Sequence, residues 1–223
     1  PPRSTLFPYT TLFRSLTDYP MPAADVPIVM ALRLPPLYLI TPPQVGERER
    51  FMQALEASLN SGIRLVQLRL FDLSEDDLVR IGREACALCH SHHASVLFNG
   101  NAETARAIGA DGLHLNSREL HAHQTRPLSA SHLLAASCHD AEDLVQAAKV
   151  GADFALLSPV LPTRSHPDAE PLGWDRFAAL VDAASMPVFA LGGMQPALLD
   201  TAWRHGAQGV AGIRGLWVDD KAG

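Results

Sequence analysis

Short apolar runs recur along the chain from Leu37 onward, and most are followed by a segment in which apolar residues return every three or four positions. The runs have the length of buried strands, and the segments between them have the period of amphipathic helices. The runs occupy residues 37–40, 65–70, 96–98, 112–115, 133–136, 154–157, 188–191 and 209–213. This alternation predicts an α/β fold, and its repetition predicts a (β/α)8 barrel, with a doubly wound open sheet as the alternative.

The ends of several predicted helices carry their own signals. Ser74 with Asp77, and Asp140 with Asp143, have the spacing of an N-cap residue and an acidic partner three positions on. Glycines that suit a left-handed C-cap stand at Gly62, Gly109, Gly151 and Gly206. Few residues remain after the last apolar run, so we expect the closing helix of the barrel to be missing or reduced.

The residues before the barrel divide into two parts. Residues 1–15 share none of the periodicity, and we expect them to be a non-native, adapter-like segment. Residues 18–29 resemble the C-terminal tail of the MutT-type Nudix hydrolases, which implies that 16–34 is the tail of an upstream Nudix domain in the same native chain. The barrel is expected over 35–217, with a short C-terminal tail at 218–223.

Charge and hydropathy narrow the range of partners. The 223 residues carry a net charge of −6, which argues against a broad basic face for nucleic acid and favours a small anionic ligand in a local cationic pocket. No apolar run is long enough to span a bilayer, and no secretory signal pattern precedes the barrel. We therefore expect a cytoplasmic protein without a membrane partner.

Two of the three cysteines form a Cys-x-x-Cys-His run at residues 86–90, the pattern of a c-type haem attachment site. His92 and His93 stand close by, which makes zinc a second formal option. The run also continues a helical apolar series. We interpret Cys86 and Cys89 as buried or half-buried helix residues in a reducing compartment, where a free cysteine behaves as a small apolar side chain; the third cysteine is Cys138.

Polar residues and glycines gather where the predicted strands end. Because the carboxyl ends of barrel strands meet at one face, these residues are the candidates for a binding or catalytic site. They are Gln67, Arg69, Asn99, His114, Ser137, His139, Thr163, Ser165, His166, Gly192, Gly193, Ile213 and Arg214. The arginines suit fork-shaped contacts with a phosphate, and the paired glycines allow backbone N–H groups to approach it. Alternatively, Gln67 and His114 fill the barrel interior and the glycines form only a tight turn.

Several of these motifs, in this order, resemble one family. They are residues 67–69 (Gln-Leu-Arg), 110–115 (Ala-Asp-Gly-Leu-His-Leu), 158–163 (Ser-Pro-Val-Leu-Pro-Thr) and 190–194 (Ala-Leu-Gly-Gly-Met). The chain from about Leu37 to Leu216 is similar to the thiamine phosphate synthases and to the related TenI-type thiazole tautomerases. The resemblance implies a transferase that joins a pyrimidine pyrophosphate to a thiazole phosphate, releases pyrophosphate and uses Mg²⁺.

The chain departs from the family's pattern where charge matters most. Phe71 and His166 stand where the resemblance implies lysines, and Arg214 stands where it implies a serine. Gly100 stands where it implies a magnesium-binding aspartate, which leaves Glu119 as a weak candidate for a metal ligand. The expected Mg²⁺ and pyrophosphate site is therefore incomplete.

Three hypotheses follow from this mixture of matches and departures. The first is a synthase in which Ser137, His139 and His166 are the catalytic candidates and the phosphate pocket is altered. The second is a metal-independent thiazole phosphate tautomerase in which His139 is the general acid and base. The third is a non-catalytic phosphate-binding module appended to a Nudix hydrolase of the 8-oxo-dGTP type. Dependence on Mg²⁺ separates the first from the second.

Overall fold

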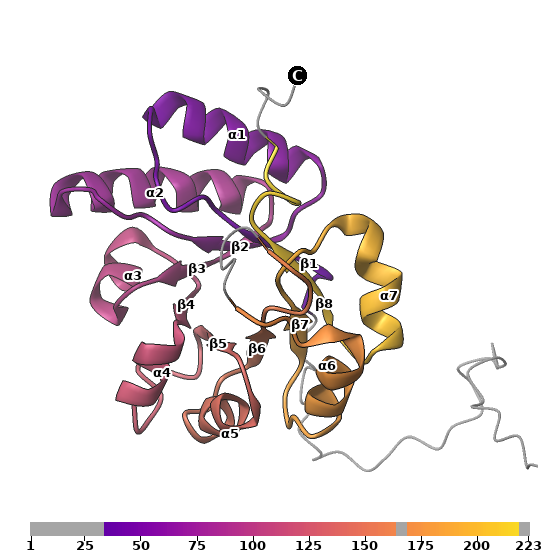
Figure 1. Ribbon diagram of the computed structural model, residues 1–223. Helices are drawn as coiled ribbons and strands as arrows, with labels where there is room; N and C mark the ends of the chain where they lie inside the picture. The colour runs from indigo at the N-terminus through magenta and orange to yellow at the C-terminus, as the bar shows by residue number, and fades with distance from the viewer. Residues whose placement is uncertain (1–33, 164–168, 219–223) are drawn as a thin grey trace, which may run out of the picture. The chain divides into compact units, whose positions relative to one another are not determined.

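The computed structural model describes residues 34–163 and 169–218, which form a closed barrel of eight parallel strands (Figure 1). The strands are β1 (Leu37–Ile40), β2 (Leu65–Leu68), β3 (Ser95–Asn99), β4 (Gly112–Leu115), β5 (Leu133–Cys138), β6 (Phe154–Leu157), β7 (Val188–Ala190) and β8 (Gly209–Gly212). Each strand pairs with its neighbours in sequence, and β1 closes the ring by pairing Leu37 with Val210 of β8. The predicted barrel is confirmed, and the open sheet is excluded.

Helices surround the barrel and connect successive strands (Figure 1). They are α1 (Arg48–Asn60), α2 (Glu75–Ser91), α3 (Ala102–Ile108), α4 (Ser117–Ala122), α5 (Ala141–Lys149), α6 (Gly173–Asp182) and α7 (Leu199–Arg204), the last preceded by the short 3-10 helix η1 (Pro196–Leu198). None of the helices described is both long and apolar enough to cross a membrane.

The predicted helix signals are found in the structure. Ser74 and Asp140 accept hydrogen bonds from the backbone N–H groups of Asp77 and Asp143, as N-cap residues do. The glycines expected at helix ends all have positive φ angles: Gly62, Gly109, Gly151 and Gly206.

The closing helix is absent from the described residues that follow β8. The chain makes a turn there instead, and Trp217 packs against Phe51 of α1 with 5.4 Å between ring centroids. The missing closing helix agrees with the prediction from the abbreviated final unit, and the indole packs against the outer core cluster.

The apolar core has two layers, because alternate side chains of each strand point to opposite faces. One layer lies between the strands and the helices and includes Ala155 and Leu157 of β6. The other fills the barrel interior and includes Phe154 and Leu156 of the same strand. Since the interior is filled by side chains, a ligand site can only lie at an end of the barrel.

Two aspartates fix the amino ends of strands. Asp111 and Asp153 each come directly after a Gly-Ala pair that lies between a helix and the next strand. The carboxylate of Asp111 accepts a hydrogen bond from the N–H of Val96, at 2.8 Å, and that of Asp153 accepts one from the N–H of Leu134, at 2.7 Å. Arg126 donates a further hydrogen bond to Asp153 at 2.6 Å. These contacts satisfy backbone donors at the second residue of β3 and of β5.

We predict that Asp153→Ala destabilises the fold by about 1–3 kcal/mol, because the fully buried Leu134 loses the acceptor for its N–H group. Asp153→Asn keeps one oxygen at that position and should cost less. Thermal unfolding of both variants, with the exposed Asp182→Ala as control, tests this; equal midpoints for Asp153→Ala and Asp182→Ala would contradict it.

Candidate functional site

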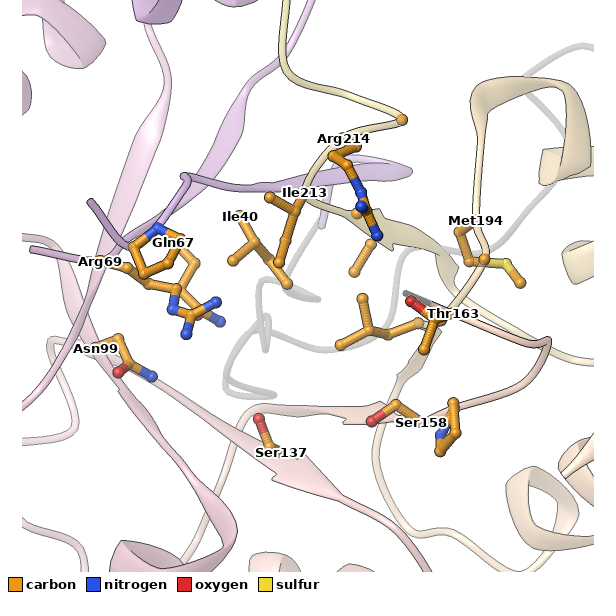
Figure 2. A pocket seen from close by; sticks show the side chains of 18 of the residues that line it. Ile40, Gln67, Arg69, Asn99, Ser137, Ser158, Thr163, Met194, Ile213 and Arg214 are labelled. Carbon is orange, nitrogen blue, oxygen red and sulfur yellow. The ribbon is translucent and has the colours of Figure 1, made fainter. Parts of the chain in front are cut away.

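A cavity of about 1150 Å³ opens at the carboxyl ends of the strands (Figure 2). The structure brings most of the predicted site residues together on its wall. Those are Gln67, Arg69, Asn99, Ser137, His139, Thr163, Gly192, Gly193, Ile213 and Arg214. They come from loops and strand ends far apart in the sequence, so the cavity is the one place where the predicted set converges.

Some predicted residues are not part of the described wall. Ser165 and His166 lie outside the described residues. His114 is fully buried and points into the barrel interior, which was the alternative interpretation of this residue. Glu119 does not line the cavity.

The sequence analysis also missed residues that do line the cavity. Asn116 and Ser117 directly follow β4, and Gln195 follows the paired glycines. The same rule that selected the other strand ends would have found Asn116 and Ser117.

Two guanidinium groups give the described wall its fixed positive charge, and both reach into the cavity (Figure 2). Thr41 fixes the backbone of Arg69 through both polar groups: the Thr41 hydroxyl accepts from the Arg69 N–H at 2.9 Å and donates to the Arg69 carbonyl at 3.3 Å. The Arg69 guanidinium lies 5.0 Å from the ring centroid of Phe71, a cation–π contact. Burial lowers the pKa of Arg69, but an arginine remains charged at neutral pH.

The loops after β6 and β7 approach each other closely, and this requires the two glycines. Gly192 and Gly193 have φ angles of 96° and 70°. A Cβ atom on Gly192 would lie 2.7 Å from Pro159 Cα, and one on Gly193 would lie 2.9 Å from Leu161 Cβ. Without these Cβ atoms the loops pair through a hydrogen bond from the Val160 N–H to the Leu191 carbonyl, at 2.8 Å. This contact between the two loops holds in place the part of the cavity wall that includes Thr163.

The environment of His139 determines which of its ring nitrogens can act as a base. Nδ1 lies 2.9 Å from the Ser158 carbonyl oxygen, which can only accept, so Nδ1 carries the proton and donates it. Nε2 of the neutral ring is then an acceptor. The backbone N–H of His139 donates to the buried Asp143 carboxylate at 2.8 Å, which fixes the residue at the start of α5.

Ser137 is hydrogen-bonded to His114, a side chain of the barrel interior. Its hydroxyl lies 2.8 Å from Nε2 of His114, and Nδ1 of His114 lies 3.2 Å from the hydroxyl of Tyr38. Burial, and secondly the positive charge of Arg69, lower the pKa of His114 to about 3. The imidazole is therefore neutral at neutral pH.

The residues described here do not suit a Mg²⁺ ion held by protein carboxylates. Glu119 caps its own helix: its carboxylate accepts from the Asn116 N–H at 3.2 Å, while the Asn116 side chain accepts from the Glu119 N–H at 2.9 Å. No carboxylate is found among the described residues of the cavity wall, and the described part of the chain has no cluster of three metal-ligand side chains. Mg²⁺ sites in proteins typically use one or two carboxylates.

Packing explains why glycine stands at position 100. A Cβ atom there would lie 2.4 Å from Cε1 of Phe98, a residue only 3% exposed. The aromatic ring fills the space in which an aspartate side chain would begin. A carboxylate at this position is thus incompatible with the present rotamer of Phe98.

The three cysteines are free and buried, which for Cys86 and Cys89 agrees with the interpretation from the sequence. Burial raises the pKa values of Cys86 and Cys89 to about 12, with a smaller contribution from the negative charge of Asp111. Burial likewise raises the pKa of Cys138. These thiols are protonated at neutral pH and behave as small apolar groups within the core.

Comparison with known proteins identifies relatives over nearly the whole described chain. A family model described as thiamine monophosphate synthase matches residues 37–216. The putative thiamine-phosphate synthase 2 of Aquifex aeolicus is 35% identical over 182 residues, covering 82% of this chain and 97% of the relative. The putative thiamine-phosphate synthase of Geobacter sulfurreducens is 39% identical over 186 residues, covering 82% of this chain and 87% of the relative.

Other relatives differ in length or in sequence. The thiamine-phosphate synthase of a Synechococcus species is 33% identical over 82% of this chain, but this match covers only 53% of the relative. The solved structure of a thiamine phosphate pyrophosphorylase from Pyrococcus furiosus superposes with a TM-score of 0.65 over 79% of this chain and 84% of that one, at 23% identity, and so supports the fold. With the match over residues 37–216, the chain belongs to the thiamine monophosphate synthase family.

Proposed function

We propose that this protein acts in thiamine biosynthesis as a transferase, joining a hydroxymethylpyrimidine pyrophosphate to a thiazole phosphate and releasing pyrophosphate. The observation that carries the proposal is the convergence of Gln67, Arg69, Asn99, Ser137 and Thr163 on one cavity at the carboxyl ends of the strands. The names of the sequence relatives favour this synthase activity over the tautomerase and over the non-catalytic module.

The chemistry requires positive charge at the leaving group. In this reaction the thiazole nitrogen forms a bond to the methylene carbon of the pyrimidine while the bond from that carbon to the pyrophosphate oxygen breaks. Negative charge collects on the departing pyrophosphate, and fixed cations in a cavity stabilise such charge. Arg69 and Arg214 supply it from the described wall. We assign Thr163 and the Gly192–Gly193 turn to phosphate binding, and Ser137 and His139 to the reacting centre.

The proposal does not include a protein-held Mg²⁺ ion, because the described wall has no carboxylate. Arg69 belongs to the family's pattern, and the guanidinium group of Arg214 takes the place of part of the charge that a metal and two lysines would provide there. His166, which lies outside the described residues, remains a candidate for a further cation.

Two finer parts of the proposal concern the setting of the barrel. A reducing, cytoplasmic location agrees with three free cysteines in the core. An upstream Nudix domain in the native chain is suggested by the sequence of residues 18–29, which lie outside the described residues. This barrel spans only about half of the Synechococcus relative, so members of this family do occur within longer chains.

The direct test is to incubate the full chain with both phosphorylated substrates and to measure thiamine phosphate and pyrophosphate, with Mg²⁺ and with a chelator. We expect one pyrophosphate to be released for each thiamine phosphate that is formed. A folded protein that forms no thiamine phosphate under either condition would exclude the synthase activity.

We predict that Arg214→Ala weakens the binding of inorganic pyrophosphate by about 1.5–3 kcal/mol, since a charge-assisted contact is lost, and that Thr163→Ala weakens it less. Isothermal titration calorimetry measures both. Arg204→Ala, an exposed arginine on α7, is the matched control and should bind as the parent protein does. Equal affinities in all four proteins would move the phosphate site elsewhere.

We predict that Gly100→Asp destabilises the fold by about 1–3 kcal/mol, because the new Cβ overlaps the ring of Phe98. Phe98→Leu shortens that side chain, so the double variant should be more stable than the sum of the two single changes implies. Thermal unfolding of the four proteins measures this coupling, and strict additivity would show that the ring is not the obstacle.

We also predict that the folded Phe98→Leu/Gly100→Asp variant gains Mg²⁺-dependent thiamine phosphate formation, because a carboxylate is restored at the cavity edge. Adding Phe71→Lys should increase the gain by placing a cation beside the leaving group. Initial rates at several Mg²⁺ concentrations provide the measurement. Rates that are the same with and without the metal in all variants would refute this prediction.

A further inference from the structure

A chain of hydrogen-bonded polar side chains runs through the largely apolar interior of the barrel. Tyr38 and His114 are both fully buried. Their neighbours in the interior include Phe154 and Phe189, whose ring centroids lie 5.4 Å and 5.8 Å from that of Tyr38. Hydrogen bonds link Tyr38 to His114 and His114 to Ser137, which lines the cavity. The chain therefore begins in the barrel interior and ends at the site.

The hydrogen bonds of this chain have a definite direction. The Tyr38 hydroxyl is buried among apolar side chains, and the hydrogen bond that its geometry supports is the one with Nδ1 of His114, at 3.2 Å. A buried phenol that only accepted would leave its own hydrogen without a partner, which costs free energy, so the Tyr38 hydroxyl donates to Nδ1 of His114.

The tautomer of His114 then determines whether the Ser137 hydroxyl accepts or donates the hydrogen bond between them. A neutral imidazole has one donor and one acceptor nitrogen. Since Nδ1 accepts from Tyr38, Nε2 carries the proton and donates it to the Ser137 hydroxyl oxygen at 2.8 Å. The hydrogen of Ser137 is left to point elsewhere, and its hydroxyl lies on the cavity wall (Figure 2).

We propose that His114, held by Tyr38, is a positioning residue that makes Ser137 a hydrogen-bond donor to the ligand. At this point of the wall the site then selects an acceptor atom, either a pyrimidine ring nitrogen or a pyrophosphate oxygen, and disfavours a donor such as an amino group. This inference rests on the proposed function in so far as it concerns the same cavity.

A purely structural role would not require this arrangement. Burying a tyrosine hydroxyl and an imidazole costs free energy that an apolar pair of similar size would avoid. Burial disfavours the protonated form of His114, and the positive charge of Arg69 disfavours it further. A protonated ring would present two donors and would reverse the hydrogen bond with Tyr38. Burial and the charge of Arg69 therefore keep the imidazole neutral, and the direction of the hydrogen bonds from Tyr38 to Ser137 depends on this neutral form.

The first test needs no ligand and no turnover. Nitrogen-15 NMR of the histidine-labelled full chain reports which ring nitrogen of His114 carries hydrogen, with His114→Gln used to assign the signal. We expect the Nε2–H form, unchanged between about pH 5 and 9, where an ordinary histidine titrates. An Nδ1–H form, or titration within that range, would overturn the proposal.

The second test is a double-mutant cycle of Ser137→Ala and His114→Phe, read as calorimetric affinity for inorganic pyrophosphate and, separately, for hydroxymethylpyrimidine. Each single change should weaken the affinity for one of these probes by up to about tenfold, the range of one hydrogen bond, and the pair should weaken it no further. The probe that shows this coupling identifies the acceptor. Additive effects with both probes would overturn the proposal.

Controls separate positioning from stability. His114→Gln places an amide N–H where Nε2–H lies and should retain most of the affinity, although its thermal midpoint falls. Phe189→Leu destabilises the same interior without removing a hydrogen bond of the chain, so its effect should add to that of Ser137→Ala. If His114→Phe does not fold, Tyr38→Phe removes only one hydroxyl and enters the same cycle.

The two proposals can fail separately. Absence of thiamine phosphate formation, together with the expected NMR form and the expected coupling, would exclude the synthase and leave the positioning role of His114 intact. Normal turnover with an Nδ1–H imidazole would exclude the positioning role of His114 and leave the synthase activity intact.

Discussion

The pairing of β1 with β8 is the constraint on which the rest of the structure depends, because it closes the sheet and gathers every strand end onto one of two rims. Closure needs Gly209, where a Cβ atom would lie 2.0 Å from the Pro36 carbonyl oxygen. With glycine there, the N–H of Val210 reaches that same carbonyl at 2.9 Å. Residues as distant in sequence as Gln67 and Arg214 can share a cavity only because the ring is complete.

Much of this could be predicted from the sequence, since strand length and helical period are local properties. The site followed from one rule, that polar residues at strand ends converge. That rule does not say which face of a strand lies inside the barrel: Leu113 and Leu115 flank His114, and both faces of a barrel strand are apolar. The direction of His114 depends on Tyr38, 76 positions away, and no local pattern reports it.

Glu119 shows a different limit of sequence reasoning. The spacing of Asn116 and Glu119 is that of a capping box, and the structure contains this box. The resemblance to a family suggested a metal ligand instead. A carboxylate already accepting a backbone hydrogen bond at its own helix start is oriented by that bond, so local helix chemistry determines where Glu119 points. Gly100 is similar, because its reason lies in the ring of Phe98.

The aspartates that accept backbone hydrogen bonds lie at the amino ends of β3 and β5, whereas Phe71, Gly100 and Arg214 lie at or near the opposite rim. The backbone hydrogen bonds of these aspartates and the cavity thus lie at opposite ends of one molecule. Natural selection can therefore vary side chains such as those of Phe71 and Arg214 at the cavity rim while the architecture persists. Position 100 differs, because a side chain there would overlap the ring of Phe98, so divergence at that point of the rim needs a compensating change in the scaffold.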